Sequence, residues 1–234
     1  MKLNVKLFAD GANKEGMLEM YSNPLISGFT TNPTLMRKSG AKNYKKYSLK
    51  LLKVCNKKPI SFEVFSDTFT GMEKQAYIIN SWGKNIYVKI PVVNSKGFFT
   101  RSVIKKLSNK GLKLNITAVY TVAQVRRILK CVNKKSKTII SIFAGRMADV
   151  GKNPVPIVKE SVSLTKKLRN IAILWASTRE AYNYTEANNY GCSIITAPAS
   201  IIEKISKFGK SYQELTLDTV KKFLKYSKES NFKI

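Results

Sequence analysis

The sequence predicts an α/β fold, a (β/α)8 barrel (TIM barrel) that forms a single domain. Short apolar runs alternate with longer amphipathic segments along the whole chain. Nearly continuous apolar strands separated by helices are typical of a parallel sheet that is covered on both faces. Eight such units in 234 residues suit a closed barrel, which commonly needs about 250 residues. An open doubly wound sheet is the alternative, but no Gly-x-Gly-x-x-Gly fingerprint opens a helix.

The predicted strands are short and rich in β-branched residues. They cover residues 5–9, 28–31, 60–64, 86–90, 114–118, 138–144, 172–176 and 193–196. The fourth strand should end near Pro91, because proline cannot donate a hydrogen bond to a sheet. Lys89 is therefore expected near the C-terminal end of a buried strand.

Segments with helical periodicity separate most of these strands. They cover residues 48–53, 70–82, 100–109, 121–132, 154–168, 178–189 and 199–208. Thr100 is a candidate N-cap, and Gly111 and Gly191 stand where two helices should end. We find no linker, so residues 1–234 are interpreted as one domain. Residues 211–234 are expected to be helical, and to close the bottom of the barrel or contact another subunit.

The chain is strongly basic, with 42 Lys and Arg against 14 Asp and Glu and a formal net charge of +28. Such a charge attracts polyanions, so a basic module that binds nucleic acid is one hypothesis. However, the lysines are spread over the whole chain and no aromatic-rich basic motif accompanies them. We favour the interpretation that they cover solvated faces, and we expect no nucleic-acid partner.

Other features argue against several classes of protein. No stretch approaches the ~18 consecutive apolar residues of a membrane helix, and the charged start does not resemble a secretory signal. The three cysteines are far apart, which indicates reduced thiols in a cytoplasmic protein rather than disulfides or a zinc site. Because the chain has no histidine, acid–base chemistry must use carboxylates, lysine, tyrosine, cysteine or water, and an imidazole metal site is excluded.

Lys89 is the candidate for covalent chemistry. A buried ammonium group is costly unless it is paired or its pKa falls. A lysine that loses its proton is a good nucleophile towards carbonyl groups. The alternative is a lysine whose side chain simply extends to solvent at the end of the strand.

Polar residues gather near the predicted C-terminal ends of seven strands, where a barrel of this type carries its active site. Each could be structural alone, but many buried polar groups at one rim would be costly without a function. They are Asp10, Thr30, Thr31, Asn32, Glu63, Lys89, Asn115, Thr117, Ser141, Arg146, Ser177 and Arg179, and the apolar Phe143 lies among them.

This set suits a lysine-dependent cleavage or transfer of a carbon–carbon bond. A neutral lysine forms an imine with a ketone, and the protonated imine accepts electrons when a neighbouring bond breaks. One carboxylate would deprotonate the hydroxyl beside that bond, and another would move protons through a water molecule. Arg146 and Arg179 could hold an anionic group such as phosphate through charge-assisted hydrogen bonds.

The strand-end motifs resemble the transaldolase family, in particular the short-chain bacterial branch that also contains fructose-6-phosphate aldolase. The resemblance covers residues 6–198, with every motif in order. The motifs are Phe8-Ala9-Asp10, Thr30-Thr31-Asn32-Pro33-Thr34-Leu35, Tyr87-Val88-Lys89-Ile90-Pro91-Val92, Asn115-Ile116-Thr117, Ser141-Ile142-Phe143-Ala144-Gly145-Arg146 and Ala176-Ser177-Thr178-Arg179.

The resemblance implies a role for each of these residues. Lys89 corresponds to the lysine that forms the Schiff base, and Asp10 to the acid–base at the C4 hydroxyl. Glu63 and Thr117 correspond to the pair that positions the catalytic water. Substrate-binding roles are implied for Asn32, Asn115, Ser141 and Phe143, and phosphate binding for Arg146, Ser177 and Arg179. The resemblance implies sugar phosphate substrates, the pentose phosphate pathway, no cofactor and no metal, and a homo-oligomer.

Two positions bear on the activity within the family. The pattern that resembles the aldolase branch would have glutamine at position 63 and tyrosine at position 143. This chain has Glu63 and Phe143, and in this it resembles true transaldolases. Phenylalanine cannot supply a proton to the carbanion. Gly11 stands where the family usually has threonine or serine after the aspartate. The segment Ala118-Val119-Tyr120 after Thr117 resembles the aldolase branch. Fructose-6-phosphate aldolase is therefore one alternative, and a transaldolase for a sulfonated ketose is another, because arginines hold either anion.

Overall fold

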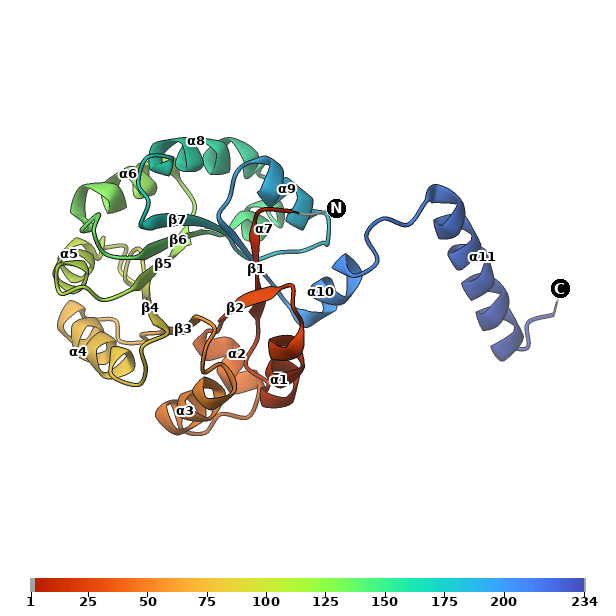
Figure 1. Ribbon diagram of the computed structural model, residues 1–234, viewed down its shortest axis with the longest axis horizontal. Helices are drawn as coiled ribbons and strands as arrows, with labels where there is room; N and C mark the ends of the chain where they lie inside the picture. Colours follow the sequence, from red (N-terminus) through yellow and green to blue (C-terminus); the bar gives the residue numbers. More distant parts are fainter. Residues whose placement is uncertain (1–2, 234) are drawn as a thin grey trace.

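Each strand pairs in parallel with the next one along the chain, and the eighth strand pairs with the first, which closes the sheet into a barrel. This computed structural model describes residues 3–233. It confirms the predicted (β/α)8 barrel and not the open sheet (Figure 1). The strands are β1 (Lys6–Asp10), β2 (Ile26–Thr30), β3 (Ile60–Glu63), β4 (Ile86–Pro91), β5 (Leu114–Val119), β6 (Thr138–Ile142), β7 (Ile171–Trp175) and β8 (Ile194–Ala197).

Helices surround the barrel as an outer ring (Figure 1). They are α1 (Lys14–Ser22), α2 (Pro33–Lys38), α3 (Tyr44–Val54), α4 (Phe69–Asn80), α5 (Arg101–Asn109), α6 (Val122–Cys131), α7 (Ala144–Ala148), α8 (Val155–Thr165), α9 (Asn183–Asn189) and α10 (Ala199–Ile205). A further helix, α11 (Tyr212–Glu229), follows at the C-terminal end. No helix within residues 3–233 is long and apolar enough to cross a membrane.

The apolar core has two parts. The larger part lies between the sheet and the helices and contains residues such as Phe29, Leu51, Val88 and Ile128, all almost completely buried. A second cluster lies apart from it; we call it the interior cluster. It consists of Phe8, Ile139, Leu174, Ala176 and Ile194. Because side chains alternate along a strand, one face of each strand packs against the helices and the other fills the barrel.

Three helices, α1, α2 and α7, were missing from the sequence prediction. Asn13 caps α1 by accepting a hydrogen bond from the backbone N–H of Gly16, and Asn32 caps α2 in the same way from Leu35. The helices α1 and α2 are short, and their only buried residues are Met17, Met20 and Met36. Such short apolar stripes give a weak helical signal, whereas an N-cap asparagine was the stronger clue.

Several predicted boundaries were also wrong. The sixth strand ends at Ile142 rather than residue 144, because Phe143 begins the turn into α7. The helix predicted for 178–189 starts only at Asn183, and the hydroxyl of Thr178 instead donates to the carbonyl of Thr196. Thr100 is at the predicted N-cap, but its hydroxyl donates to the carbonyl of Pro91 rather than to its own helix. The remaining strands and helices shift by a few residues at either end.

The C-terminal helix does not cover the bottom of the barrel. Figure 1 shows α11 standing apart from the barrel, connected through the segment after α10. No residue of α11 is buried, and its apolar side chains, including Phe223 and Leu224, are more than half exposed at 68% and 55%. Residues 1, 2 and 234 of the predicted domain and tail lie outside the described residues.

Candidate active site

The strand register brings three predicted residues to the same level of the barrel. Glu63 on β3 is paired with Lys89 on β4, and Lys89 is paired with Asn115 on β5. Thr117 lies two residues further along β5, opposite Pro91. Side chains at paired positions in parallel strands point to the same face, so these four residues converge at the C-terminal ends of their strands.

The ammonium group of Lys89 is buried and paired. Its Nζ donates to the carbonyl oxygen of Thr31 at 2.9 Å and lies 3.2 Å from Oε2 of Glu63. The side chains of Lys89 and Glu63 are only 8% and 19% exposed. The lysine therefore does not extend to solvent. A carboxylate this close can accept a proton from the ammonium group, which is required before the amine can react with a carbonyl.

Glu63 is itself held by Tyr44 on α3. The Tyr44 hydroxyl donates to the carbonyl oxygen of Glu63 and accepts from its backbone N–H, both at 3.0 Å. Burial raises the pKa of Tyr44, so the hydroxyl stays protonated and can make both contacts. Tyr44 thereby secures the end of β3, from which the carboxylate points at Lys89.

Asp10 ends β1 beside a second network of hydrogen bonds. The hydroxyl of Thr30 donates to Oδ1 of Asp10 at 2.7 Å, and it lies 2.6 Å from the hydroxyl of Thr196. Burial raises the pKa of Asp10, while the positive charge of Lys89 and the hydrogen bond from Thr30 partly oppose that rise. A carboxyl group with a raised pKa is suited to exchange protons near neutral pH.

Asn115 lies in the middle of a chain of buried hydrogen bonds. Ser141 donates to its Oδ1 at 2.7 Å, and its Nδ2 donates to the hydroxyl of Ser61 at 3.1 Å. These contacts fix the orientation of the amide. Next to it, the hydroxyl of Thr117 is buried and makes no hydrogen bond to any described residue. A buried hydroxyl without a protein partner is suited to bind a substrate group or a water molecule.

Asn32 has both a structural and a candidate binding role. Its Oδ1 accepts the N–H of Leu35 at 2.9 Å as the N-cap of α2, so the carbonyl end of the amide is occupied. The NH2 end can donate to a substrate oxygen. This capping role does not conflict with the binding role that the resemblance implies for Asn32.

The predicted anion site lies at the ends of β6 and β7. The guanidinium of Arg179 forms a forked pair with Asp149 at the end of α7, with Nε–Oδ1 at 2.9 Å and Nη2–Oδ2 at 2.6 Å. Its Nη1 donates to the carbonyl of Ser177 at 3.0 Å. By contrast, Arg146 lies with its Cζ 5.6 Å from the ring centre of Phe143 and forms no ion pair within residues 3–233. Arg146 is therefore the more available cation.

A tight backbone approach holds this corner together. Ser177 has a positive φ of 66°. A Cβ atom at position 145 would lie 1.6 Å from the carbonyl oxygen of Ser177. Only glycine is compatible with this contact. Gly145 therefore allows the loop after β7 to lie against α7, which brings Ser177 towards Arg146.

One cavity of about 330 Å³ contains nearly all of the predicted site. The exceptions are Glu63 and Thr31, which both contact the ammonium group of Lys89. The lining consists of Asp10, Thr30, Asn32, Leu35, Lys38, Lys89, Asn115, Thr117, Ser141, Phe143, Arg146, Leu174, Ala176, Ser177, Arg179 and Thr196.

Some of the site's residues were not predicted as such. Lys38 ends α2 and adds a further cation to the cavity, but nothing marked it among 42 basic residues. Thr30 was noted at a strand end without a role, and it proves to hold Asp10. Tyr44 and Asp149 act through residues far along the chain, so no local pattern could reveal them.

Comparisons with known proteins show the family to which the chain is related. The family described as Transaldolase/Fructose-6-phosphate aldolase matches residues 7–234. A probable transaldolase from Caldicellulosiruptor saccharolyticus is 33% identical over 223 residues, covering 94% of this chain and 96% of that protein. A probable transaldolase from Thermoplasma volcanium is 32% identical, covering 91% of this chain and 92% of that protein.

The chain belongs to the transaldolase/fructose-6-phosphate aldolase family. This places it among enzymes of the aldolase and transaldolase type. Similarity in structure alone extends more widely. Dihydrodipicolinate synthase from Thermotoga maritima superposes with a TM-score of 0.62 at 12% identity, covering 86% of this chain and 72% of that chain. At such low identity the likeness shows only that the two proteins share a barrel fold.

Proposed function

We propose that the protein is a transaldolase that moves a dihydroxyacetone unit from fructose 6-phosphate or sedoheptulose 7-phosphate to an aldose phosphate such as erythrose 4-phosphate. The observation that carries the proposal is the contact between Lys89 and Glu63 inside a cavity that also contains Asp10. It supplies one nucleophile and two carboxyl groups in different surroundings. Such a set serves both the formation of an imine and the cleavage of a carbon–carbon bond.

The first stage is imine formation at Lys89. The Nζ atom gives up a proton to Glu63, directly or through a water molecule, and attacks the ketone carbon of the donor sugar. The ketone oxygen takes up protons and leaves as water, which produces a protonated imine. The unpaired hydroxyl of Thr117 and the carboxylate of Glu63 are on neighbouring sides of Lys89, where they can hold the water that carries these protons.

The second stage is cleavage. Asp10 removes the proton from the C4 hydroxyl of the donor, the C3–C4 bond breaks, and its electron pair moves into the imine to form an enamine. The aldehyde half departs, and the acceptor aldehyde enters. The enamine then attacks the acceptor, and Asp10 returns the proton to the new hydroxyl. Water then hydrolyses the new imine, which releases the product ketose and regenerates the amine of Lys89. The raised pKa of Asp10 helps because its carboxyl group must bind a proton in one step and release it in the next.

The phosphate group would be held at the ends of β6 and β7. Arg146 and Ser177 offer donors on one side of the cavity, and Lys38 adds a positive charge. The forked pair with Asp149 orients Arg179 but also neutralises part of its charge. Because arginine can hold either anion, a ketose that carries a sulfonate in place of phosphate is a second candidate substrate.

Transfer is favoured over release of free dihydroxyacetone by the residue at position 143. Phe143 lines the cavity and cannot protonate the enamine. The relatives named probable transaldolase support the same choice. Fructose-6-phosphate aldolase activity is the alternative, since the family contains both. A basic polyanion-binding module is the alternative of another class, but it gives no role to the buried pair of Lys89 and Glu63.

Two further features of the proposal concern the protein's setting. A transaldolase of this kind would act in the cytoplasm, in the pentose phosphate pathway.

We also propose a homo-oligomer in which α11 packs against a neighbouring subunit. Most of the stability of a helix in a protein comes from packing its apolar face, and α11 leaves Val220, Phe223 and Leu224 exposed. A chain ending at residue 210 should then assemble into fewer subunits than the full chain, which light scattering measures.

The activity is tested by following products with and without an acceptor. With fructose 6-phosphate and erythrose 4-phosphate, the protein should form sedoheptulose 7-phosphate with no accumulation of dihydroxyacetone. Steady release of dihydroxyacetone in the absence of an acceptor would identify the aldolase instead. No reaction with any phosphorylated ketose, but rapid reaction with a sulfonated one, would identify the third candidate.

A further inference from the structure

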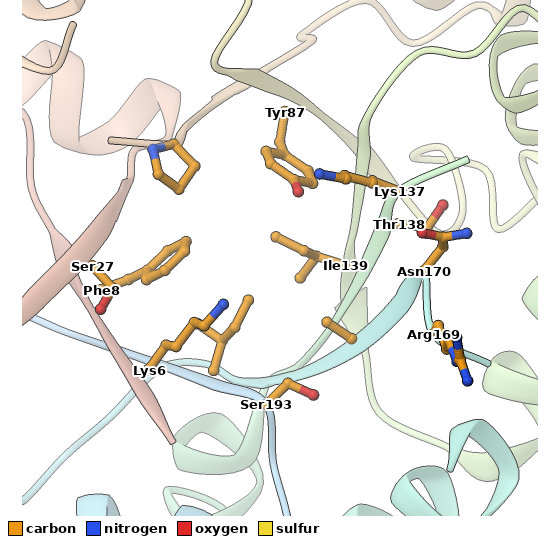
Figure 2. Close-up of a pocket in the computed structure, with 13 residues that line it drawn as sticks. Lys6, Phe8, Ser27, Tyr87, Lys137, Thr138, Ile139, Arg169, Asn170 and Ser193 are labelled. Atoms are coloured by element: carbon orange, nitrogen blue, oxygen red, sulfur yellow. The ribbon is translucent and has the colours of Figure 1, made fainter. Parts of the chain in front are cut away.

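A second hollow lies at the opposite end of the barrel from the active-site cavity (Figure 2). Its lining residues stand at the N-terminal ends of the strands; Lys6 begins β1, Thr138 begins β6 and Ile194 begins β8. Its volume of about 550 Å³ exceeds the roughly 330 Å³ of the active-site cavity. Pockets for small molecules commonly measure about 300–1,000 Å³. The hollow is therefore large enough for a compact organic ligand.

The inner surface of this hollow is apolar and aromatic. Phe8, Ile139 and Ile194 belong to the interior cluster, and Tyr87 points into the hollow beside them (Figure 2). The same cluster includes Leu174 and Ala176, which line the active-site cavity. The cluster thus separates the two cavities, so a molecule in the lower hollow would not occupy the active site.

Positive charge is concentrated around this apolar surface. Lys6 and Lys137 extend over the hollow from opposite walls, and Arg169 stands at its rim (Figure 2). No aspartate or glutamate is among the described residues that line it. Within residues 3–233 none of these three side chains forms an ion pair.

The hollow also differs from the rest of the basic surface. Elsewhere several cations have a carboxylate partner, as Arg126 has in Glu160 and Lys106 has in Glu73. Here three like charges from separate parts of the chain surround one concave apolar surface. Like charges that converge without a counter-charge raise the local concentration of anions. The hydroxyls of Ser27 and Ser193 add hydrogen-bond donors to the lining.

We propose that this lower hollow is a binding site for an organic phosphate of nucleotide size. The phosphate would lie between Lys6 and Lys137, and the planar or apolar part of the ligand would rest on Phe8 and Tyr87. A phosphate monoester carries nearly two negative charges at neutral pH, which matches the uncompensated cations better than a neutral sugar does. The site does not depend on the transferase activity proposed above.

The test is calorimetric titration of the full-length protein with AMP, with adenosine and inorganic phosphate as separate probes. AMP should bind more tightly than either, because only AMP has both the charge and the planar part. The Lys6→Gln/Lys137→Gln double variant should bind AMP at least about tenfold more weakly, since it loses two charge-assisted contacts. The matched control, Lys50→Gln/Lys53→Gln on α3, removes the same charge from the outer surface of a helix and should bind as the wild type does.

Two further variants distinguish a shaped binding site from general attraction to a basic surface. Ser193→Trp keeps all three cations and fills the opening, so it should abolish binding, whereas general attraction would survive this change. Arg146→Gln alters the active-site cavity and should leave AMP binding unchanged. The proposal is overturned if AMP does not bind, if Ser193→Trp binds normally, or if Arg146→Gln loses binding while the Lys6 and Lys137 variant keeps it. Turnover of the lower-site variants reports that they are folded.

Discussion

Nζ of Lys89 on β4 lies 3.2 Å from a carboxylate oxygen of Glu63 on β3, and the two residues are direct partners in the strand register. The contact stabilises a buried ammonium group and also provides a carboxylate that can take up its proton. A purely structural ion pair would need no open cavity beside it. Here the lysine lines a cavity that also contains Asp10 and Arg146.

Replacing Glu63 by glutamine should slow imine formation. The amide keeps the size of the side chain but cannot accept a proton from Lys89, so the rate should fall by about 10²–10⁴-fold, the usual contribution of a general base. Single-turnover measurement of imine formation checks this. Glu73→Gln is the matched control, because Glu73 pairs with Lys106 on the outer helices and should leave the rate unchanged. Equal rates for Glu63→Gln and the wild type would contradict a proton-transfer role.

Asp10→Asn should lose most of the activity yet gain stability at neutral pH. Burial raises the pKa of Asp10, so folding favours its protonated form, and the ionised form weakens the fold as the pH rises above the usual aspartate range near about 3.9. The variant's advantage in the free energy of unfolding should therefore shrink as the pH falls towards that range. Urea unfolding of both proteins between acid and neutral pH measures the difference.

Asp67 provides a control of opposite sign. Hydrogen bonds from Ser95 lower the pKa of this exposed carboxyl, so its stabilising effect is present above the usual aspartate pKa and is lost in acid. Asp67→Asn should lose stability at neutral pH, with unchanged activity. If Asp10→Asn behaved in the same way as Asp67→Asn, the assignment of a desolvated carboxyl at position 10 would be wrong.

Arg146→Gln should weaken binding of phosphorylated donors specifically. We expect KM for fructose 6-phosphate to rise at least about tenfold, because a charge-assisted fork to phosphate is lost. The reaction with fructose as an unphosphorylated donor and an unphosphorylated aldehyde as acceptor should change little. Arg126→Gln removes a cation that pairs with Glu160 outside the barrel, and it serves as the control. Equal losses with both donors would place Arg146 in the chemical steps or in the fold rather than in phosphate binding.

Gly145→Ala should damage both the fold and the phosphate site. The added methyl group would lie 1.6 Å from the carbonyl oxygen of Ser177, so the loop after β7 must move away. Overpacking of this kind typically costs about 1–3 kcal/mol. Thermal unfolding and KM measure the two effects. Gly11→Ala has no atom within 4 Å of the new Cβ and should unfold as the wild type does.

The fold and most of the candidate site could be predicted because both depend on local patterns. The apolar strands alternate with helices, and residues such as Asp10, Lys89 and Asn115 follow from their positions at strand ends. The contacts of Tyr44 with Glu63 and of Asp149 with Arg179 join distant segments, so no local pattern indicated them. The place of α11 was not predictable either, because none of its apolar residues is buried within the described chain.

The most direct test of the central claim is reductive trapping with borohydride in the presence of fructose 6-phosphate, followed by peptide mass mapping. The proposal predicts one stable adduct, carrying the dihydroxyacetone or fructose phosphate unit, on the peptide that contains Lys89. Lys89→Met should fold, as circular dichroism can show, and should give neither adduct nor turnover. The absence of an adduct on the active wild type, or an adduct on another lysine such as Lys38, would contradict the proposed role of Lys89.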